Sequence, residues 1–310
     1  MPRRSTRPSR ASVIYEAFST LRTGAPIPRP ASPGAIALPR VQVCRSGLAG
    51  AGLGAAPMRR RRPAASATRS DAAFATAVAV LAYLNCVRNG FVFDDHPAIE
   101  RNPVVQDAAG GWRAALGTDF WGTPLADARS HHSYRPLAVL TLWFDRHLGM
   151  PGASGFHLTN VLLHAAATSL VCSLAALALP GRRAVALGAA LLFATHPLNT
   201  EATAYCVGRA DLLAAVLGLA GLRTHAAASA CTGDRAATAL RFAAAGLLCL
   251  ALGCKETALM LLPTCAVWDI LLPFHHAPSP RRWSRLMLRW SGLAAAAAAF
   301  GWVRAVHVGP

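Results

Sequence analysis

The chain has 310 residues, of which 54% are hydrophobic and only 15% are charged. Soluble domains carry about 25% charged residues, so this composition excludes disorder for most of the chain and disfavours a soluble globule. The net charge of +17 suggests a nucleic-acid partner, but residues 1–70 alone hold 13 arginines and one acid, Glu16. The other 240 residues carry 18 basic and 13 acidic side chains. The basic excess is therefore a local property, and we expect no nucleic-acid partner.

Residues 1–57 are rich in Pro, Ala, Ser and Arg and lack a sustained apolar period. Such a segment cannot bury enough apolar surface to fold alone. We interpret it as a disordered leader, with an organelle transit peptide or an upstream extension before Met58 as alternatives. Residues 58–310 then form one multi-pass membrane domain.

That domain contains about seven apolar runs, many of which approach the roughly 20 residues needed to cross a bilayer. They lie at residues 72–88, 155–179, 184–196, 202–222, 236–253, 257–272 and 286–306, and a further, shorter apolar run lies at residues 136–149. The sequence therefore predicts an all-α, polytopic membrane helix bundle. Arginines gather in alternate connections, which the positive-inside rule assigns to the cytosol. They are Arg59–Arg62, Arg182, Arg183, Arg223, Arg235, Arg281, Arg282 and Arg285.

This topology leaves residues 89–154, 196–203 and 253–257 on the non-cytosolic side. The first of these segments begins with NGFVFDDHPAIERNP, in which Asp94 and Asp95 directly follow the first span. Adjacent carboxylates at a membrane boundary are typical of a general base or a cation site. A solvated turn is the alternative, since Asp and Pro both favour turns.

The same segment continues through a predicted amphipathic helix over residues 104–116, which would lie on the membrane surface with Val104, Val105, Ala108, Trp112 and Leu116 on one face. It ends in the string SHHSYRP, whose cationic side chains are candidates for binding a phosphate: His131, His132 and Arg135.

Further polar residues interrupt the apolar helices. His157, Asn160 and His164 share one face, where they serve either function or hydrogen bonding between helices. Glu201, Tyr205 and Arg209 follow at four-residue spacing and predict a polar stripe, with Arg209 paired to Glu201 or Asp211 or bound to a lipid phosphate. Lys255 and Glu256 are adjacent and are interpreted as an interfacial pair.

Several enzyme classes are excluded because their motifs do not occur. The sequence contains no P-loop, no GxGxxG after a strand, no HExxH and no GxSxG. The eight cysteines form no CxxC pair, so we interpret them as small apolar residues and not as a metal or disulfide framework.

Six strings together resemble the transmembrane and tetratricopeptide-repeat (TMTC) family: FVFDDHPAIERNP, TDFWGTPL, SHHSYRPLAVLT, GFHLTNVLLH, LLFATHPLNTEATAYCVGRADLLA and CKETALMLLP. They occur in the family's order from Phe91 to Pro263. The resemblance implies a GT-C-type glycosyltransferase core of the endoplasmic reticulum membrane. It also implies transfer of mannose from dolichyl-phosphate-mannose to Ser or Thr of secretory proteins, notably cadherins. The family's lumenal tetratricopeptide repeats are not seen before Pro310, which suggests a truncated product or a pared-down relative.

The resemblance places the chemistry on the acid pair. Asp94 or Asp95 would be the general base of an inverting displacement, and the sequence does not choose between them. His131, His132, Arg135 and Arg209 would bind the leaving phosphate, and Glu201 would orient Arg209 or the acceptor. No cofactor is required, although the acid pair could hold a divalent cation. The alternatives are an inactive membrane interaction protein on the same core and, less favoured, a transporter.

Overall fold

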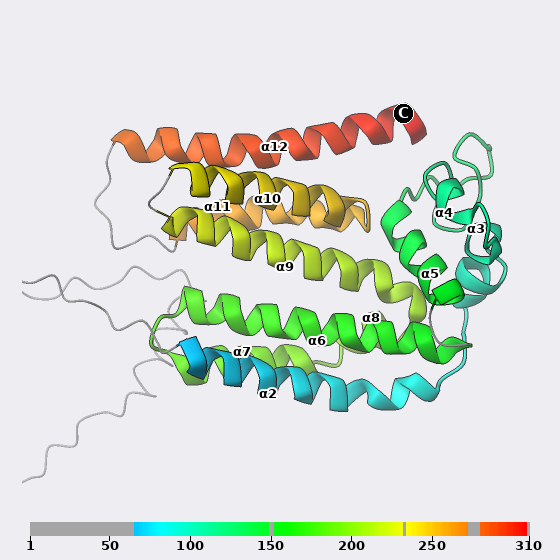
Figure 1. The fold of residues 1–310 in the computed structure, drawn as a ribbon, viewed down its shortest axis with the longest axis horizontal. Helices are drawn as coiled ribbons and strands as arrows, with labels where there is room; N and C mark the ends of the chain where they lie inside the picture. The colour runs from blue at the N-terminus through cyan, green and yellow to red at the C-terminus, as the bar shows by residue number, and fades with distance from the viewer. Residues whose placement is uncertain (1–64, 149–151, 232–233, 272–279, 309–310) are drawn as a thin grey trace, which may run out of the picture. The chain divides into compact units, whose positions relative to one another are not determined.

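The computed structural model describes residues 65–148, 152–231, 234–271 and 280–308, so the predicted leader over residues 1–57 lies outside the described residues. Its long helices are α2 (Ala65–Tyr83), α5 (Pro136–Leu148), α6 (Ala153–Ala178), α7 (Arg183–Thr195), α9 (Arg209–Ala230), α10 (Asp234–Leu252), α11 (Leu261–Leu271) and α12 (Pro280–Val308). They run side by side, except α5, which lies at the end of the bundle near α3 (Pro103–Gln106) and α4 (Gly111–Ala114) (Figure 1). The described ranges contain no strand, only one isolated bridge between Thr118 and Pro124. The predicted all-α fold is confirmed.

Residues 84–135 connect α2 to α5 and form the first connection. Short elements join the long helices at the end of the bundle where this connection lies. They are η1 (Leu84–Arg88), the π-turn η2 (His96–Glu100), α3 (Pro103–Gln106), α4 (Gly111–Ala114), α8 (Asn199–Ala204), η3 (Cys206–Gly208) and η4 (Glu256–Met260).

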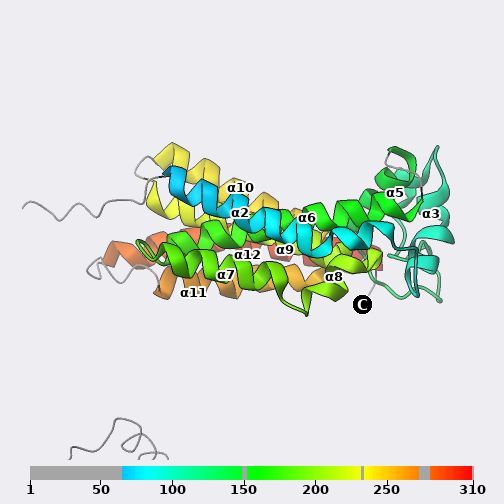
Figure 2. The ribbon, with the colours of Figure 1, turned by 90° about the horizontal axis from the view of Figure 1, so that it is seen from below.

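The helices pack as two groups that meet along α6 and α9. The first group contains α2, α6 and α7, and the second contains α9, α10, α11 and α12. Figure 2 shows the same neighbours after a quarter turn. The contact between α6 and α9 matters for the site, because the N-terminal ends of both helices lie beside Asp94 and Asp95.

Large apolar side chains face outward on these helices, as expected for contact with lipid. Leu81, Leu162 and Leu192 are exposed, while the polar His157, Asn160 and His164 are buried. Among the described residues, four helical segments are long and apolar enough to cross a membrane: Thr68–Arg88, Ala153–Ala178, Cys206–Ser229 and Arg235–Leu252. The shorter apolar helix Arg183–Thr195 is a fifth such segment only if the bilayer thins around it. The number of spans, predicted as about seven, stays a prediction.

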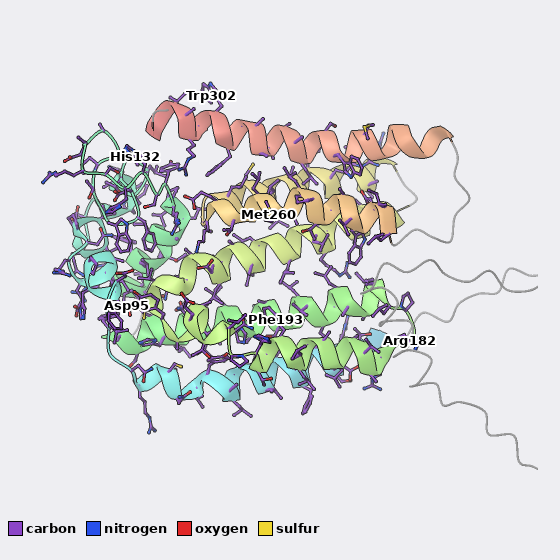
Figure 3. All side chains as sticks on the ribbon, turned by 180° about the vertical axis from the view of Figure 1, so that it is seen from behind. Asp95, His132, Arg182, Phe193, Met260 and Trp302 are labelled. Carbon is purple, nitrogen blue, oxygen red and sulfur yellow. The ribbon has the colours of Figure 1, made fainter. Side chains whose placement is uncertain are left out.

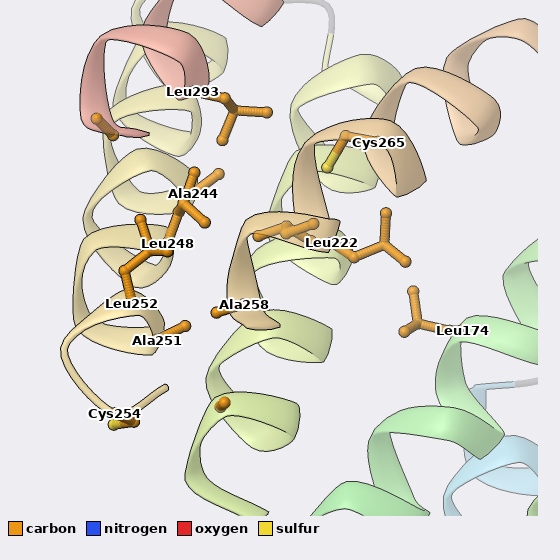
Figure 4. Close-up of a cluster of buried hydrophobic side chains, with 13 residues drawn as sticks. Leu174, Leu222, Ala244, Leu248, Ala251, Leu252, Cys254, Ala258, Cys265 and Leu293 are labelled. Carbon is orange, nitrogen blue, oxygen red and sulfur yellow. The ribbon is translucent and has the colours of Figure 1, made fainter. Parts of the chain in front are cut away.

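The core of the second group is built mainly from leucine, alanine and cysteine (Figure 4). Leu248 and Ala251 of α10 face Leu222 of α9, Cys265 of α11 and Leu293 of α12. Small residues let helices approach closely, which strengthens dispersion contacts where no water is available to drive association. These packed helices support the connections at the end of the bundle where Asp95 lies.

The connection between η2 and α5 is ordered by two buried polar side chains. Asn102 caps α3 by accepting from the Val104 and Val105 amides, and it donates to the Phe120 carbonyl. Asp119 accepts hydrogen bonds from the amides of Trp121, Thr123 and His131 and from the Ser130 hydroxyl. Each satisfied group removes the cost of a buried unpaired donor or acceptor.

The amphipathic helix predicted over residues 104–116 is wrong. The structure has two single turns, α3 and α4, separated where Asp107 turns to extended backbone and its carboxylate accepts from the amides of Ala109 and Gly110. Local side-chain hydrogen bonds of this kind compete with helix. Val104 and Val105 are buried whereas Trp112 and Leu116 are exposed, so the four residues do not share a face.

Candidate active site

The acid pair lies on a tight turn that gives its two members opposite environments. Phe93 has a φ of 44°, in the left-handed region that residues with a side chain seldom adopt. The turn leaves the Asp94 carboxylate exposed and buries Asp95 completely. The backbone amide of Asp94 donates to the Tyr205 hydroxyl oxygen at 2.8 Å, which ties the turn to the segment before α9.

The Asp95 carboxylate is used as a structural acceptor. Its Oδ2 accepts from the Val92 amide at 3.2 Å, and its Oδ1 accepts from the Val207 amide at 3.0 Å. Burial raises the pKa of Asp95 above its ordinary value of 3.8, although the two amides oppose that shift. Asp95 therefore joins the first connection to η3 and leaves Asp94 as the carboxylate that a substrate can reach.

Arg209, at the first position of α9, is fully buried and is surrounded by acceptors. Its Nη1 lies 2.6 Å from Asp145 Oδ2 and also donates to the Thr141 carbonyl, while Nη2 donates to the Phe156 carbonyl. Its Nε donates to Asn160 Oδ1 at 3.0 Å. The geometry favours a role for Arg209 in holding α5, α6 and α9 together; contact with a phosphate stays a prediction.

The shared face of His157, Asn160 and His164 is confirmed, and all three are buried. Asn160 donates to the carbonyl of Tyr205 at 2.9 Å, and His164 Nε2 lies 3.0 Å from the Ala194 carbonyl. His157 Nε2 lies 3.4 Å from the Gly90 carbonyl, beside the turn of the acid pair. This face of α6 therefore hydrogen-bonds to the backbone of neighbouring segments, which agrees with the predicted alternative of hydrogen bonding between helices.

The polar stripe predicted for Glu201, Tyr205 and Arg209 is wrong. The helix is interrupted at Tyr205, whose backbone is extended with a ψ of 121°, so the three residues do not share one helical face. Glu201 is exposed on α8, and Arg209 pairs with Asp145, not with Glu201 or Asp211. The interruption allows η3 to present the Val207 amide to Asp95.

Lys255 and Glu256, interpreted as an interfacial pair, bind different partners, and their position at a membrane interface stays a prediction. Lys255 Nζ lies 2.6 Å from Asp211, while Glu256 Oε2 lies 3.1 Å from Arg135. Alternation along an extended backbone sends neighbouring side chains in different directions, and Lys255 is extended with φ of −160°.

The predicted phosphate ligands of the first connection lie near each other in sequence but differ in environment. His131 and His132 are exposed, and His132 has a φ of 54°. The Arg135 guanidinium lies over the Phe120 ring at 5.6 Å and is bound to Glu256. Figure 3 shows Asp95 and His132 at one end of the bundle and Arg182 at the other. The candidate residues thus share the end opposite one of the arginine clusters.

The sequence did not predict four partners of the candidate residues. Asp145 and Asn160 bind Arg209, Glu256 binds Arg135, and Arg304 binds Glu256. An acid inside the apolar run at residues 136–149 was a signal for Asp145, since buried charges need partners. Within the described ranges, no group of three or more His, Cys, Asp or Glu side chains is arranged to hold a metal. A cation at Asp94 and Asp95 stays a prediction.

A helix bundle with leucines outside, buried ion pairs inside and polar connections at one end defines a multi-pass α-helical membrane protein. No family model matches the chain, and no solved structure matches it. It is, however, similar to curated proteins of one family.

Protein O-mannosyl-transferase Tmtc2 of Drosophila melanogaster is 43% identical over 208 residues, which are 64% of this chain and 21% of that protein. Protein O-mannosyl-transferase Tmtc1 of the same organism is 42% identical over 221 residues, 69% of this chain and 25% of that protein. Protein O-mannosyl-transferase TMTC3 of Homo sapiens is 33% identical over 195 residues, 63% and 21% of the two chains. The resemblance of the membrane part to the TMTC family is confirmed, and the chain spans about a quarter of the length of these relatives.

Proposed function

We propose that this chain carries the membrane core of a protein O-mannosyltransferase that uses dolichyl-phosphate-mannose. The observation that carries the proposal is the exposed Asp94 carboxylate, held beside the buried Asp95 at the end of the bundle that also holds His132. The names of the relatives support the reaction class.

The reaction would be a single displacement at the anomeric carbon. Asp94 takes the proton of a Ser or Thr hydroxyl as its oxygen attacks C1 of mannose. The bond between C1 and the phosphate oxygen breaks with inversion, and dolichyl phosphate leaves. A positioned general base contributes typically 10²–10⁴-fold to such a step, and cationic side chains stabilise the leaving phosphate.

Asp95 would act as a positioning residue in this scheme. It accepts amides from both Val92 and Val207, and this pair of bonds links the turn before Asp94 to η3. A carboxylate fixed in this way cannot approach a substrate without breaking a buried hydrogen bond, which favours Asp94 as the base.

The resemblance supports the endoplasmic reticulum membrane as the location and the lumen as the side of transfer. The proposed acceptors are Ser and Thr of secretory proteins of the cadherin kind. Four helices long and apolar enough to cross a membrane support the embedding.

The test is transfer of radiolabelled mannose from dolichyl-phosphate-mannose to a cadherin-derived peptide, in microsomes that contain the whole chain. We expect Asp94→Asn to reduce transfer about 100-fold or more, because the general base is lost. Asp127→Asn is the matched control, since Asp127 lies in the same connection and its carboxylate pairs with the exposed Arg129. It should transfer at the wild-type rate.

Full transfer by Asp94→Asn would reject it as the base, and absence of transfer by the wild type would favour the inactive interaction protein. Addition of EDTA in the same assay tests the cation. We expect no change, because both Asp95 oxygens already accept amides and leave Asp94 as a single ligand.

A further inference from the structure

Two arginines that are far apart in the sequence meet on one glutamate. Arg135, at the start of α5, contacts Glu256 Oε2 through Nε at 3.2 Å and Nη2 at 3.1 Å. Arg304, near the end of α12, contacts Glu256 Oε1 through Nη1 at 3.1 Å. Arg304 Nη2 also donates to the His132 carbonyl at 3.3 Å. We call Arg135, Glu256 and Arg304 the arginine clamp.

The clamp has an excess of positive charge. Burial raises the pKa of Glu256, but its backbone hydrogen bond and the two arginines outweigh burial and hold it below the ordinary value of 4.5. Glu256 is therefore ionised, and the three side chains carry a net charge of about +1 at neutral pH. Two guanidiniums have about ten N–H donors, whereas one carboxylate offers about four lone-pair sites. Donor capacity for a second anion remains.

The clamp is also accessible. The side chains of Arg135, Glu256 and Arg304 are 22%, 35% and 37% exposed, unlike the fully buried Arg209. The surface beside Glu256 is apolar, because Leu259 and Met260 on the same short helix η4 are exposed. Figure 3 shows His132 and Trp302 at the same end of the bundle.

We propose that the arginine clamp binds the phosphate of a polyprenyl-phosphate lipid, with Arg304 of α12 as a phosphate ligand not expected from the sequence. A phosphodiester carries one negative charge, which matches the excess charge of the clamp, and guanidinium forks fit phosphate oxygens. The apolar border accommodates the first isoprene units, which a soluble phosphate would not need. This inference rests on the proposed function and names the residues that hold the donor in it.

Binding can be measured without transfer. The whole chain in microsomes is crosslinked with a photoactivatable, radiolabelled short-chain analogue of dolichyl-phosphate-mannose, which is a phosphodiester. We expect Arg304→Gln to weaken capture about tenfold or more, the effect of losing hydrogen bonds to a charged group. Arg304→Lys keeps the charge without the guanidinium fork and should lose less capture than Arg304→Gln. Arg129→Gln removes an exposed arginine of the same side, which is 86% exposed, and should change capture less than about twofold.

Competitors separate the sources of phosphate. Unlabelled dolichyl phosphate should displace the probe, whereas dolichol and inorganic phosphate at the same concentration should not. The inference is overturned if Arg304→Gln captures the probe as the wild type does, or if Arg304→Lys or Arg129→Gln loses as much as Arg304→Gln. It is also overturned if dolichol or inorganic phosphate competes equally. Capture through Arg304 without mannose transfer would support the clamp while rejecting the proposed reaction.

Discussion

The left-handed backbone of Phe93 separates two carboxylates that are adjacent in sequence. A non-glycine residue in this region costs of order 1–3 kcal/mol, and the surrounding contacts must compensate for it. Asp95 provides two of these contacts, through the amides of Val92 and Val207. At the scale of single residues, one acid stabilises the turn so that the other can face the acceptor.

Asp95→Asn should destabilise the protein. An amide side chain has one acceptor oxygen and places its NH₂ group against the second backbone N–H, so one buried hydrogen bond is lost. We expect a loss of about 1–3 kcal/mol in the free energy of unfolding. The measurement is thermal unfolding of the purified chain in detergent, with Asp127→Asn as a control that should unfold like the wild type.

The same variant should show a pH dependence of defined sign. Because burial raises the folded-state pKa of Asp95 above 3.8, the folded state binds its proton more tightly than the unfolded state. The contribution of Asp95 to stability is therefore greatest at low pH and declines as pH rises from 3.8 through the folded-state pKa. The Tm difference between wild type and Asp95→Asn should narrow from pH 4 to pH 7, and a widening would contradict the raised pKa.

At the scale of elements, Arg209 and Asp145 decide how α9 docks on α5 and α6. The guanidinium is only 1% exposed, and it also binds carbonyls of both helices. Such a pair is weak evidence for net stability, but removal of one member leaves a buried charge.

Asp145→Asn should therefore destabilise the chain by about 3–5 kcal/mol. Asp211→Asn is the comparison, because the Asp211 side chain is 45% exposed where it pairs with Lys255 and such pairs are worth about 0–1 kcal/mol. Both variants are compared by unfolding in detergent. Equal effects of the two variants would mean that the burial of Arg209 does not govern the docking of α9.

At the scale of the whole membrane domain, the ends of the helices differ in charge and in polar content. Arg182 lies at the end opposite to Asp95 and His132 (Figure 3). The positive-inside rule then predicts that the acid pair faces away from the cytosol.

Insertion of a glycosylation sequon tests this topology. A sequon at the exposed Ala128 should be glycosylated in microsomes, whereas one flanked by Gly-Ser linkers at the exposed turn of Gly181 should not. Glycosylation is scored as a gel shift that endoglycosidase H removes. The reverse pattern would place the acid pair in the cytosol and reject lumenal transfer.

The amino-acid sequence by itself determined the fold class, the shared face of His157, Asn160 and His164, and the family resemblance. These follow from hydropathy, helical period and short strings, all of which are local properties. The bounds of α6 and α10 lie within two residues of predicted runs, whereas those of α2 and α9 differ from predicted runs by five to eight residues.

Only the tertiary structure decided the partners. Arg209 pairs with Asp145 and not with Glu201 or Asp211. Glu256 pairs with Arg135 and Arg304, while its neighbour Lys255 pairs with Asp211. The pairing of a buried charge depends on which helices meet and where a helix is interrupted, as at Tyr205, and spacing along the chain does not contain this information. The same reason explains why the sequence could not choose between Asp94 and Asp95: their difference arises from the Val207 amide, which reaches Asp95 only in the folded protein.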